Sequence, residues 1–469
     1  MSLPNGWTQA PLGNLLNAIE AGKNLRCEER PPRAGELGVV KVSAVTWGHF
    51  DPSQSKTLPT DYSPPKDAQI RHGDLLISRA NTLELVGAVV LVENEPDGLF
   101  LSDKILRLVV DNELKRWLLS FLRSPYGRAQ IEALATGNQL SMRNISQEAL
   151  RNIETPIPPA PEQRRIVAKL DALFARLARA RVELDRIPSL SSRLRSQAVR
   201  SAFEGKLSAE WRAKHQAEGT IDKKTSVLPT GWHSVTLGEL SDIKSGITLG
   251  KKRPVNAVLT DVPYLRVANV QRGRLNLSVI KEIAVTQAEA ESLYLQSGDI
   301  LLNEGGDRDK LGRGWVWSGE ISNCIHQNHV FRARLYDKRH SPKYISFYAN
   351  EFGQDYFFEH GTQTTNLASI SKSKLSSLPV PLAPPEEQAE IVRLLEDAFA
   401  RADRLEAEAA RARALLDRLE AAILTKAFKG ELVPQDPNDE PASVLLERIR
   451  AQRAAAEPVP SAKRGRRAQ

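Results

Sequence analysis

The sequence has almost no cysteine and no long apolar run. Its two cysteines, Cys27 and Cys324, have no metal-ligand spacing and form no disulfide framework. No apolar stretch reaches the length that spans a membrane, and no charged-then-apolar signal segment opens the chain. These absences argue against a disulfide scaffold and a membrane protein, and they predict a cytosolic one. With 469 residues and 41% hydrophobic content, the chain can bury cores in three or four domain-sized units.

Sequence motifs of enzymes are also missing. The Gly246–Lys251 run is one residue too short for a phosphate-binding P-loop, and Lys252 stands where that motif needs Ser or Thr. There is no Asn-Pro-Pro-Tyr or Asp-Pro-Pro-Tyr segment of an amino-methylating enzyme, and no glycine-rich cofactor fingerprint follows a strand. The sequence therefore predicts a binding protein, not an enzyme.

The charge balance is mildly basic. The chain has 65 Lys and Arg against 57 Asp and Glu, which gives a net charge of +8 and a pI of about 9.3. Such basicity can serve solubility alone. A nucleic-acid partner is the better interpretation, because Lys and Arg neutralise phosphates.

The chain contains an internal repeat, with two copies of one sequence pattern. Trp7, in Leu-Pro-Asn-Gly-Trp, recurs as Trp232 in Leu-Pro-Thr-Gly-Trp. The repeat shift, which takes Trp7 to Trp232, also relates Gly73-Asp74 to Gly298-Asp299, Asn144-Ile145-Ser146 to Ser369-Ile370-Ser371, Gln163 to Gln388, and Phe203, Gly205 and Leu207 to Phe428, Gly430 and Leu432. One constant register indicates two copies of one structural plan. Duplex DNA read as two half-sites is the commonest target with matching two-fold geometry.

The first part of each repeat, 1–157 and 226–382, predicts a mixed α/β globule. Short alternating apolar runs follow turn residues, as strands do. The expected strand pairs are 39–45 with 264–270, 74–78 with 299–303, and 104–108 with 329–333, and the helical stretches lie near 113–134 and 341–359.

The second part of each repeat, 158–225 and 383–450, predicts a long helix after a proline-rich hinge that ends the globule. Glu162-Gln163 and Glu387-Gln388 suit a first helical turn. Apolar residues then recur with heptad spacing, which is typical of a coiled coil. Pro188 predicts a kink or break in the first helix. The expected helix-pairing residues are Ile166, Leu170, Leu173, Leu177, Leu184 and Leu194 in copy one, and Ile391, Leu395, Leu405, Leu416, Leu419 and Ile423 in copy two.

The two helices have opposite charge. Between Glu162 and Glu210 there are 11 basic and 6 acidic residues, whereas between Glu386 and Val433 there are 8 basic and 11 acidic. Opposite charge favours pairing of unlike helices. The predicted fold class is therefore α+β: a tandem pseudo-symmetric repeat whose two helices form an antiparallel coiled coil. The alternative is that each helix packs only on its own globule. The basic tail, 451–469, is expected to be disordered.

Two further motifs suggest metal sites, and each has a plainer interpretation. Glu204-Gly205-Lys206 resembles part of a nuclease motif, but its counterpart is Lys429-Gly430-Glu431, so a packing corner fits better. His326 and His329 could hold a metal ion, although a polar strand edge is the commoner arrangement.

Taken together, these motifs resemble the specificity subunit of type I restriction–modification systems, over nearly the whole chain. The resemblance rests on the duplicated Leu-Pro-X-Gly-Trp opening, the Gly-Asp strand, the hinge ending in Glu-Gln, and the helix closing with Phe-X-Gly-X-Leu. It implies two target recognition domains, each reading half of a split sequence in double-stranded DNA, and two conserved helical regions. The helices would dock two modification subunits and the restriction subunits. It also implies no catalysis, cofactor or metal in this chain, since the partners would use S-adenosylmethionine, ATP and Mg.

Loop residues that differ between the copies are the candidates for DNA contact, with a solvated surface charge or free drift of surface loops as the alternative for each. Cations would hold phosphates, and amide or hydroxyl groups would read base edges in the major groove. The candidates are Lys23, Arg26, Arg79, Asn81 and Asn138 in the first domain, and Lys244, Thr248, Lys251, Lys252, Arg253, Arg308, Lys310, Arg313, Thr362, Gln363 and Thr364 in the second. Two other functions stay open: an assembly scaffold that binds no DNA, and a freestanding methyltransferase or nuclease.

Overall fold

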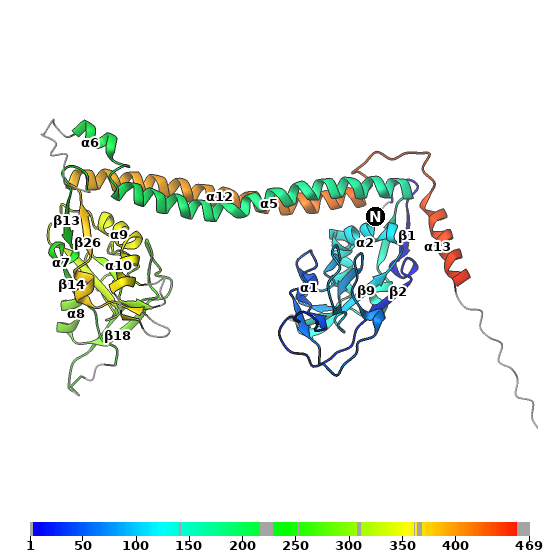
Figure 1. The fold of residues 1–469 in the computed structure, drawn as a ribbon, viewed down its shortest axis with the longest axis horizontal. Coiled ribbons are helices and arrows are strands. Elements are labelled where there is room, and N and C mark those ends of the chain that lie inside the picture. The colour runs from blue at the N-terminus through cyan, green and yellow to red at the C-terminus, as the bar shows by residue number, and fades with distance from the viewer. Residues whose placement is uncertain are drawn as a thin grey trace, which may run out of the picture. The chain divides into compact units, whose positions relative to one another are not determined.

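The computed structural model describes residues 3–139, 142–215, 228–250, 253–254, 256–306, 311–360, 362–363 and 368–456. It has a mixed α+β fold and divides into two compact units (Figure 1). Unit 1 consists of Met1–Leu184 and Arg411–Gln469, and unit 2 consists of Asp185–Ala410. Among the described residues, no helix is long and apolar enough to cross a membrane.

Unit 1 is built on a four-stranded antiparallel sheet of order β2-β9-β5-β7. The β5 residues are all buried, and they alternate between two cores: Leu75 and Ile77 pack in one, Leu76 in the other. A second sheet, β4-β3-β8, lies beside it. The strands of unit 1 are β1 (Thr8–Pro11), β2 (Ala18–Ala21), β3 (Gly38–Val40), β4 (Ser55–Thr57), β5 (Leu75–Ser78), β6 (Ala80–Asn81), β7 (Val89–Leu91), β8 (Leu99–Phe100), β9 (Ile105–Val109), β10 (Thr136–Gln139), β11 (Met142–Asn144) and β12 (Glu154–Ile157).

Unit 2 repeats this plan with the sheets β14-β23-β19-β21 and β18-β15-β22. In β19, Ile300 and Leu302 face one core and Leu301 faces another, as their counterparts do in β5. The strands of unit 2 are β13 (His233–Thr236), β14 (Ser241–Ser245), β15 (Thr260–Leu265), β16 (Val270–Gln271), β17 (Arg274–Leu275), β18 (Lys281–Val285), β19 (Ile300–Asn303), β20 (Gly305–Gly306), β21 (Gly314–Val316), β22 (Ile325–His326), β23 (Val330–Leu335), β24 (Thr362–Gln363), β25 (Ala368–Ser369) and β26 (Pro379–Leu382).

Helices cover the sheets near the expected places. In unit 1, Ser124 separates α2 from α3, because Pro125 disfavours helical backbone in the residue before it. The serine hydroxyl instead accepts the Gly127 N–H and caps α3. The shorter helices are η1 (Leu12–Asn14), α1 (Ser43–Thr46), η2 (Lys66–Ala68), α2 (Asn112–Arg123), α3 (Pro125–Leu134), α4 (Gln147–Arg151), α6 (Ala209–His215), α7 (Leu237–Leu240), α8 (Gln287–Leu293), α9 (Pro342–Glu351), α10 (Gly353–His360) and α11 (Lys372–Ser376).

Three local predictions were wrong. The strand expected over 39–45 ends at Val40, and α1 follows it. The strand expected over 264–270 ends at Leu265, and the next strand begins only at Val270. Ala44 and Val45 are both buried in the same core, which a helical turn allows and the alternating faces of a strand do not. The proline-rich hinge is not a loop either, because Pro156 lies in β12 and pairs with β1. A two-stranded ladder leaves one edge of each strand free, so a missing N–H is tolerated.

The long helices are α5 (Ala160–Phe203) and α12 (Pro385–Phe428). The expected break at Pro188 does not occur, since α5 continues through it. Each helix begins in the unit of its own repeat and ends in the other unit. Within unit 2, Phe203 at the end of α5 packs on Tyr344 with ring centroids 4.8 Å apart. Within unit 1, Phe428 at the end of α12 packs on Trp117 at 4.7 Å.

Both long helices end in the same tight turn. Gly205 and Gly430 have φ of 71° and 72°, the left-handed conformation that closes helices. The N–H of Lys206 returns to the Ser201 carbonyl at 2.9 Å. A Cβ on Gly205 would come within 2.2 Å of the ring of Pro229, so the helix-closing motif meets the Leu-Pro-X-Gly-Trp motif here. The Phe-X-Gly-X-Leu segment is therefore a packing corner, and the described residues contain no acidic or histidine cluster suited to a metal.

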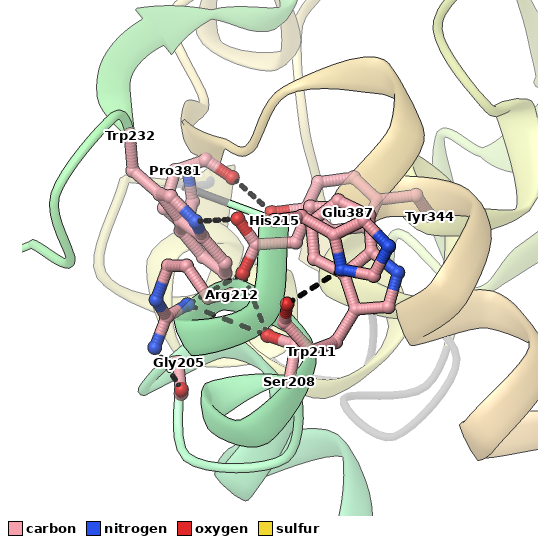
Figure 2. Close-up of polar contacts among 9 residues, drawn as sticks. All are labelled: Gly205, Ser208, Trp211, Arg212, His215, Trp232, Tyr344, Pro381 and Glu387. Carbon is pink, nitrogen blue, oxygen red and sulfur yellow. Dashed lines mark hydrogen bonds and ion pairs between the residues drawn. The ribbon is translucent and has the colours of Figure 1, made fainter. Parts of the chain in front are cut away.

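A tryptophan–glutamate hydrogen bond joins the start of each long helix to its unit. In unit 2 the Trp232 Nε1 donates to Glu387 at 2.9 Å, and Ser208 and Arg212 donate to the other carboxylate oxygen (Figure 2). Figure 2 also shows Tyr344, which donates to the Pro381 carbonyl at 2.6 Å. These bonds satisfy a carboxylate that is completely buried.

In unit 1 the matching bond runs from the Trp7 Nε1 to Glu162 at 3.0 Å. Gln435 lies 3.5 Å from the other carboxylate oxygen, and among the described residues no arginine takes the place of Arg212. Burial raises the pKa of Glu162, against which the Trp7 hydrogen bond acts.

Most of the expected helix-pairing residues are buried or half-buried. Ile166, Leu170, Leu177, Ile391, Leu395 and Ile423 are buried, and Leu173, Leu184 and Leu416 are half-buried. Leu194, Leu405 and Leu419 are exposed at 41%, 53% and 48%, so they add nothing to a buried seam. Ala402 and Ala409, which belong to the same heptad series of α12, are buried.

The C-terminal segment is helical further than expected. Helix α13 (Ala442–Ala456) packs Ala442, Leu446 and Ile449 into the core of unit 1. It continues past Ala451, where a disordered tail was expected, because this apolar face is buried. The rest of that tail, 457–469, lies outside the described residues.

Candidate nucleic-acid interface

Each unit has a small three-stranded ribbon next to its central sheet. In unit 1 the ribbon has the order β10-β11-β6, and in unit 2 it has the order β24-β25-β20. Asn144 pairs with Ala80 in the first ribbon, and Ser369 pairs with Gly305 in the second, so the two pairs obey the repeat shift. Each ribbon therefore holds segments that are far apart in sequence. In unit 1 the strands of Asn81 and Asn138 lie on either side of β11, and in unit 2 β20 and the strand of Thr362 and Gln363 lie on either side of β25.

The unit 1 candidates differ in how free their side chains are. Lys23, Arg26 and Arg79 are exposed. Asn81 is half-buried, and its side chain accepts the Thr82 N–H at 2.9 Å, so it shapes the ribbon turn. Asn138 belongs to β10, and its side chain lies outside the described residues.

The basic loop of unit 2, residues 244–253, has some exposed side chains and others that are hydrogen-bonded or ion-paired. Lys244 lies in β14, and its Nζ donates to the Ser292 carbonyl at 2.9 Å. Thr248 is exposed at the following turn. Arg253 forms an ion pair with Glu289 of α8 at 2.7 Å, and both side chains are mostly buried. Arg253 therefore stabilises the position of α8. Lys251 and Lys252 lie outside the described residues.

The same loop shows that the repeat shift fails locally. Gly22 and Gly246 occupy the same place, because a Cβ on either would collide with the facing carbonyl of Leu101 or His326. The repeat shift would instead align Gly22 with Ile247, so these two loops differ from that shift by one residue. Lys23 is the true match of Ile247, as their bridges to Ser102 and Gln327 confirm.

The remaining candidates of unit 2 are only partly described. Arg308, Lys310 and Thr364 lie outside the described residues, as do the side chains of Thr362 and Gln363. Arg313 is half-buried and lines a cavity of about 840 Å³.

Sequence reasoning missed two arginines at this cavity. Arg272 and Arg274 are exposed on the turn between β16 and β17, on either side of Gly273. Arg195 of α5 also lines the cavity, but Asp403 and Glu406 engage it. The run Gln-Arg-Gly-Arg was the available signal, since a glycine between two cations predicts a tight basic turn.

The two histidines have different surroundings and different partners. His326 is completely buried, its Nδ1 lies 2.6 Å from the Val330 carbonyl oxygen, and burial lowers its pKa to about 4. His329 is exposed and pairs with Glu304, with Nδ1 2.6 Å from the carboxylate.

Comparison with known proteins agrees with this geometry. The family described as "Type I restriction modification DNA specificity domain" matches residues 54–184 and 229–411. The chain is 27% identical to the type I restriction enzyme EcoKI specificity subunit of Escherichia coli (strain K12), over 97% of each chain. It is also 27% identical to the StySPI specificity subunit of Salmonella potsdam, over 96% of each.

Solved structures share the fold. The HsdS subunit from Thermoanaerobacter tengcongensis superposes with a TM-score of 0.54 at 22% identity, covering 92% of this chain and 99% of that one. A chain solved for the complex assembly and conformational transition of the type I R-M system gives 0.59 at 24% identity, covering 92% and 100%. The chain belongs to the family of type I restriction modification DNA specificity domains.

Proposed function

We propose that this chain is the non-catalytic subunit that recognises DNA for a type I restriction–modification complex, with each unit reading one half of a two-part target. The observation that carries the proposal is the duplicated fold with different exposed loops. Recognition domains at 1–157 and 226–382 present equivalent ribbons, and the side chains around them differ. Two units with the same backbone fold and different polar surfaces are suited to recognise two different base sequences.

Phosphate contacts would come from exposed cations of each unit. Lys23 and Arg26 serve unit 1, and Arg272 and Arg274 serve unit 2. Such contacts fix the register of a protein on the duplex, while amide and hydroxyl groups nearby read base edges.

The helical regions, 158–225 and 383–450, would act as the spacer between half-sites by pairing as an antiparallel coiled coil. Ion pairs between the helices support this. In unit 1 Arg181 contacts Asp417 at 2.7 Å, and in unit 2 Arg195 contacts Glu406 at 2.8 Å. Both pairs join a cation of α5 to an anion of α12, as the opposite net charges predict.

The same helices would dock two modification subunits. Leu190 and Leu194 are exposed on α5, one turn apart on one face. Leu415 and Leu419 are exposed on α12, at the positions that the repeat shift assigns to them. Exposed leucines repeated at equivalent places favour two copies of one partner. Methylation with S-adenosylmethionine, and cleavage with ATP and Mg, would belong to the partners.

A gel shift of the full chain with its modification subunits tests the proposal. Specific binding should weaken steeply as salt rises, because each phosphate contact releases counterions. Arg272→Ala with Arg274→Ala should reduce that salt slope by about two. A salt-insensitive complex, or equal affinity for every duplex, would favour a scaffold that binds only proteins.

A further inference from the structure

One residue at the entry to each ribbon occupies a fixed place in both units. In unit 1 this ribbon-entry residue is Arg79, between β5 and β6. Its N–H donates to the Lys104 carbonyl at 2.8 Å, and its carbonyl accepts the Ile145 N–H at 2.9 Å. Both main-chain groups are thus held, and the side chain is exposed.

In unit 2 the ribbon-entry residue is Glu304, between β19 and β20. Its N–H donates to the His329 carbonyl at 3.0 Å, and its carbonyl accepts the Ile370 N–H at 2.8 Å. The repeat shift relates Glu304 and both of these partners to Arg79 and its partners in unit 1. The backbone is therefore the same in both units, and only the side chain differs.

The side chains have opposite hydrogen-bonding character. Arg79 and the neighbouring Lys104 are exposed donors. Glu304 is an acceptor whose carboxylate is held by the Nδ1 of His329 at 2.6 Å, with the two side chains 29% and 55% exposed. The carboxylate is thus oriented while part of it stays open to solvent.

The ribbon-entry residue of unit 2 also adjoins the basic loop. Asn328, next to His329, donates its N–H to the Ile247 carbonyl at 2.9 Å, and its carbonyl accepts the Ser245 hydroxyl at 2.9 Å. The glutamate–histidine pair is therefore linked, through the main chain of Asn328, to the segment that precedes Thr248. A carboxylate held in place loses less entropy on binding than a free surface glutamate.

We propose that the ribbon-entry residues determine specificity, each for its own half-site. Arg79 takes a base that presents two acceptors in the major groove, as guanine does with N7 and O6. Glu304 takes an exocyclic amino group, as cytosine presents with N4. His329 is a positioning residue for this carboxylate. This inference rests on the proposed function.

Selection from a randomised duplex library tests the inference. The full chain, assembled with its modification subunits, is challenged at one salt concentration, and the bound DNA is sequenced. Glu304→Gln and Glu304→Ala should each reduce discrimination roughly tenfold at one position of one half-site. Arg79→Ala should do so in the other half-site. Glu304→Arg, which installs the unit 1 residue, should shift the preference toward guanine.

The unaffected half-site reports in the same molecule that each variant is folded and assembled. Glu282→Gln and Arg33→Ala, at exposed positions of units 2 and 1, should leave both half-sites unchanged. Wild-type base preferences in both Glu304→Ala and Arg79→Ala would overturn the inference. A wild-type complex that enriches no two-part sequence would overturn the proposed function itself, and the inference with it.

Discussion

The indole nitrogen of Trp232 lies 2.9 Å from a carboxylate oxygen of Glu387, and both residues are almost completely buried. The opening motif of each repeat is therefore hydrogen-bonded to the first turn of the helix that follows it. Trp7 and Glu162 repeat the contact in unit 1. The motif serves the junction between recognition domain and helix, and we expect its loss to destabilise the protein without touching the DNA surface.

The junction of unit 2 should be the more sensitive of the two. Glu387→Gln removes the charge that Arg212 and Ser208 share with Trp232, and it leaves a mostly buried arginine without its carboxylate. The expected loss of unfolding free energy is about 1–3 kcal/mol. Glu162→Gln, whose carboxylate has no such described arginine contact, should cost less. Urea unfolding of both full-length variants measures the difference, and equal losses would contradict the assignment.

The glycine at the end of α5 should tolerate no side chain. Gly205→Ala places a Cβ 2.2 Å from Pro229 and keeps an unfavourable φ of 71°. Gly319→Ala is the matched control, because it has a positive φ but open space around it. The control should cost about 1–2 kcal/mol, and Gly205→Ala clearly more. Similar thermal unfolding of the two variants would show that the contact with Pro229 is unimportant.

Acid should destabilise unit 2 through His326. The folded protein keeps this ring neutral until about pH 4, whereas the unfolded chain protonates it near its ordinary pKa of 6.5. The unfolded state therefore binds more protons below pH 6.5, and stability falls between there and pH 4, by up to about 3 kcal/mol.

His326→Leu, which installs the residue found at Leu101 in unit 1, should remove this part of the acid dependence. Unfolding of the wild type and the variant at pH 7.5 and pH 5 gives the comparison. An identical loss of stability on acidification in both would show that His326 does not carry it.

Apolar packing should stabilise the long helices of unit 2 more than the ion pairs between them do. Arg195 is 26% exposed and its partner Asp403 is 71% exposed, so Arg195→Ala should cost under about 1 kcal/mol. Leu395→Ala empties a fully buried site of unit 2 and should cost about 2–5 kcal/mol. A larger effect of the arginine variant in chemical unfolding would reverse this ranking.

Many of the strands and helices could be predicted from the sequence, because the apolar residues recur with regular spacing and the pattern occurs twice. The strands beginning after Gly73 and Gly298 were predicted, since a glycine turn precedes an unbroken apolar run. Periodicity failed where tertiary packing chose between faces of similar polarity. Leu405 fits the heptad and is exposed, whereas Ala402 and Ala409 of the same series are buried. Pro188 predicted a kink or a break, and α5 continues through it without a break.

The candidate interface was harder to predict. Side-chain availability depends on partners that no local pattern reveals, such as Glu289 for Arg253. The glutamate–histidine pair joins two distant parts of the sequence, and it becomes visible only when β19 and β23 lie side by side. The local change of register between Gly22 and Gly246 also hid the true correspondence of the two loops.

In the proposed function, paired helices set the spacing at which two similar units read DNA. The gap between half-sites after both long helices are shortened measures this directly. Removing about seven residues from α5 near Asp185 and about seven from α12 near Ala410 shortens each by about 10 Å, or roughly three base pairs of duplex. Target selection with the variant should recover the same two half-sites with a correspondingly shorter gap. The same half-sites at the wild-type gap would contradict the claim.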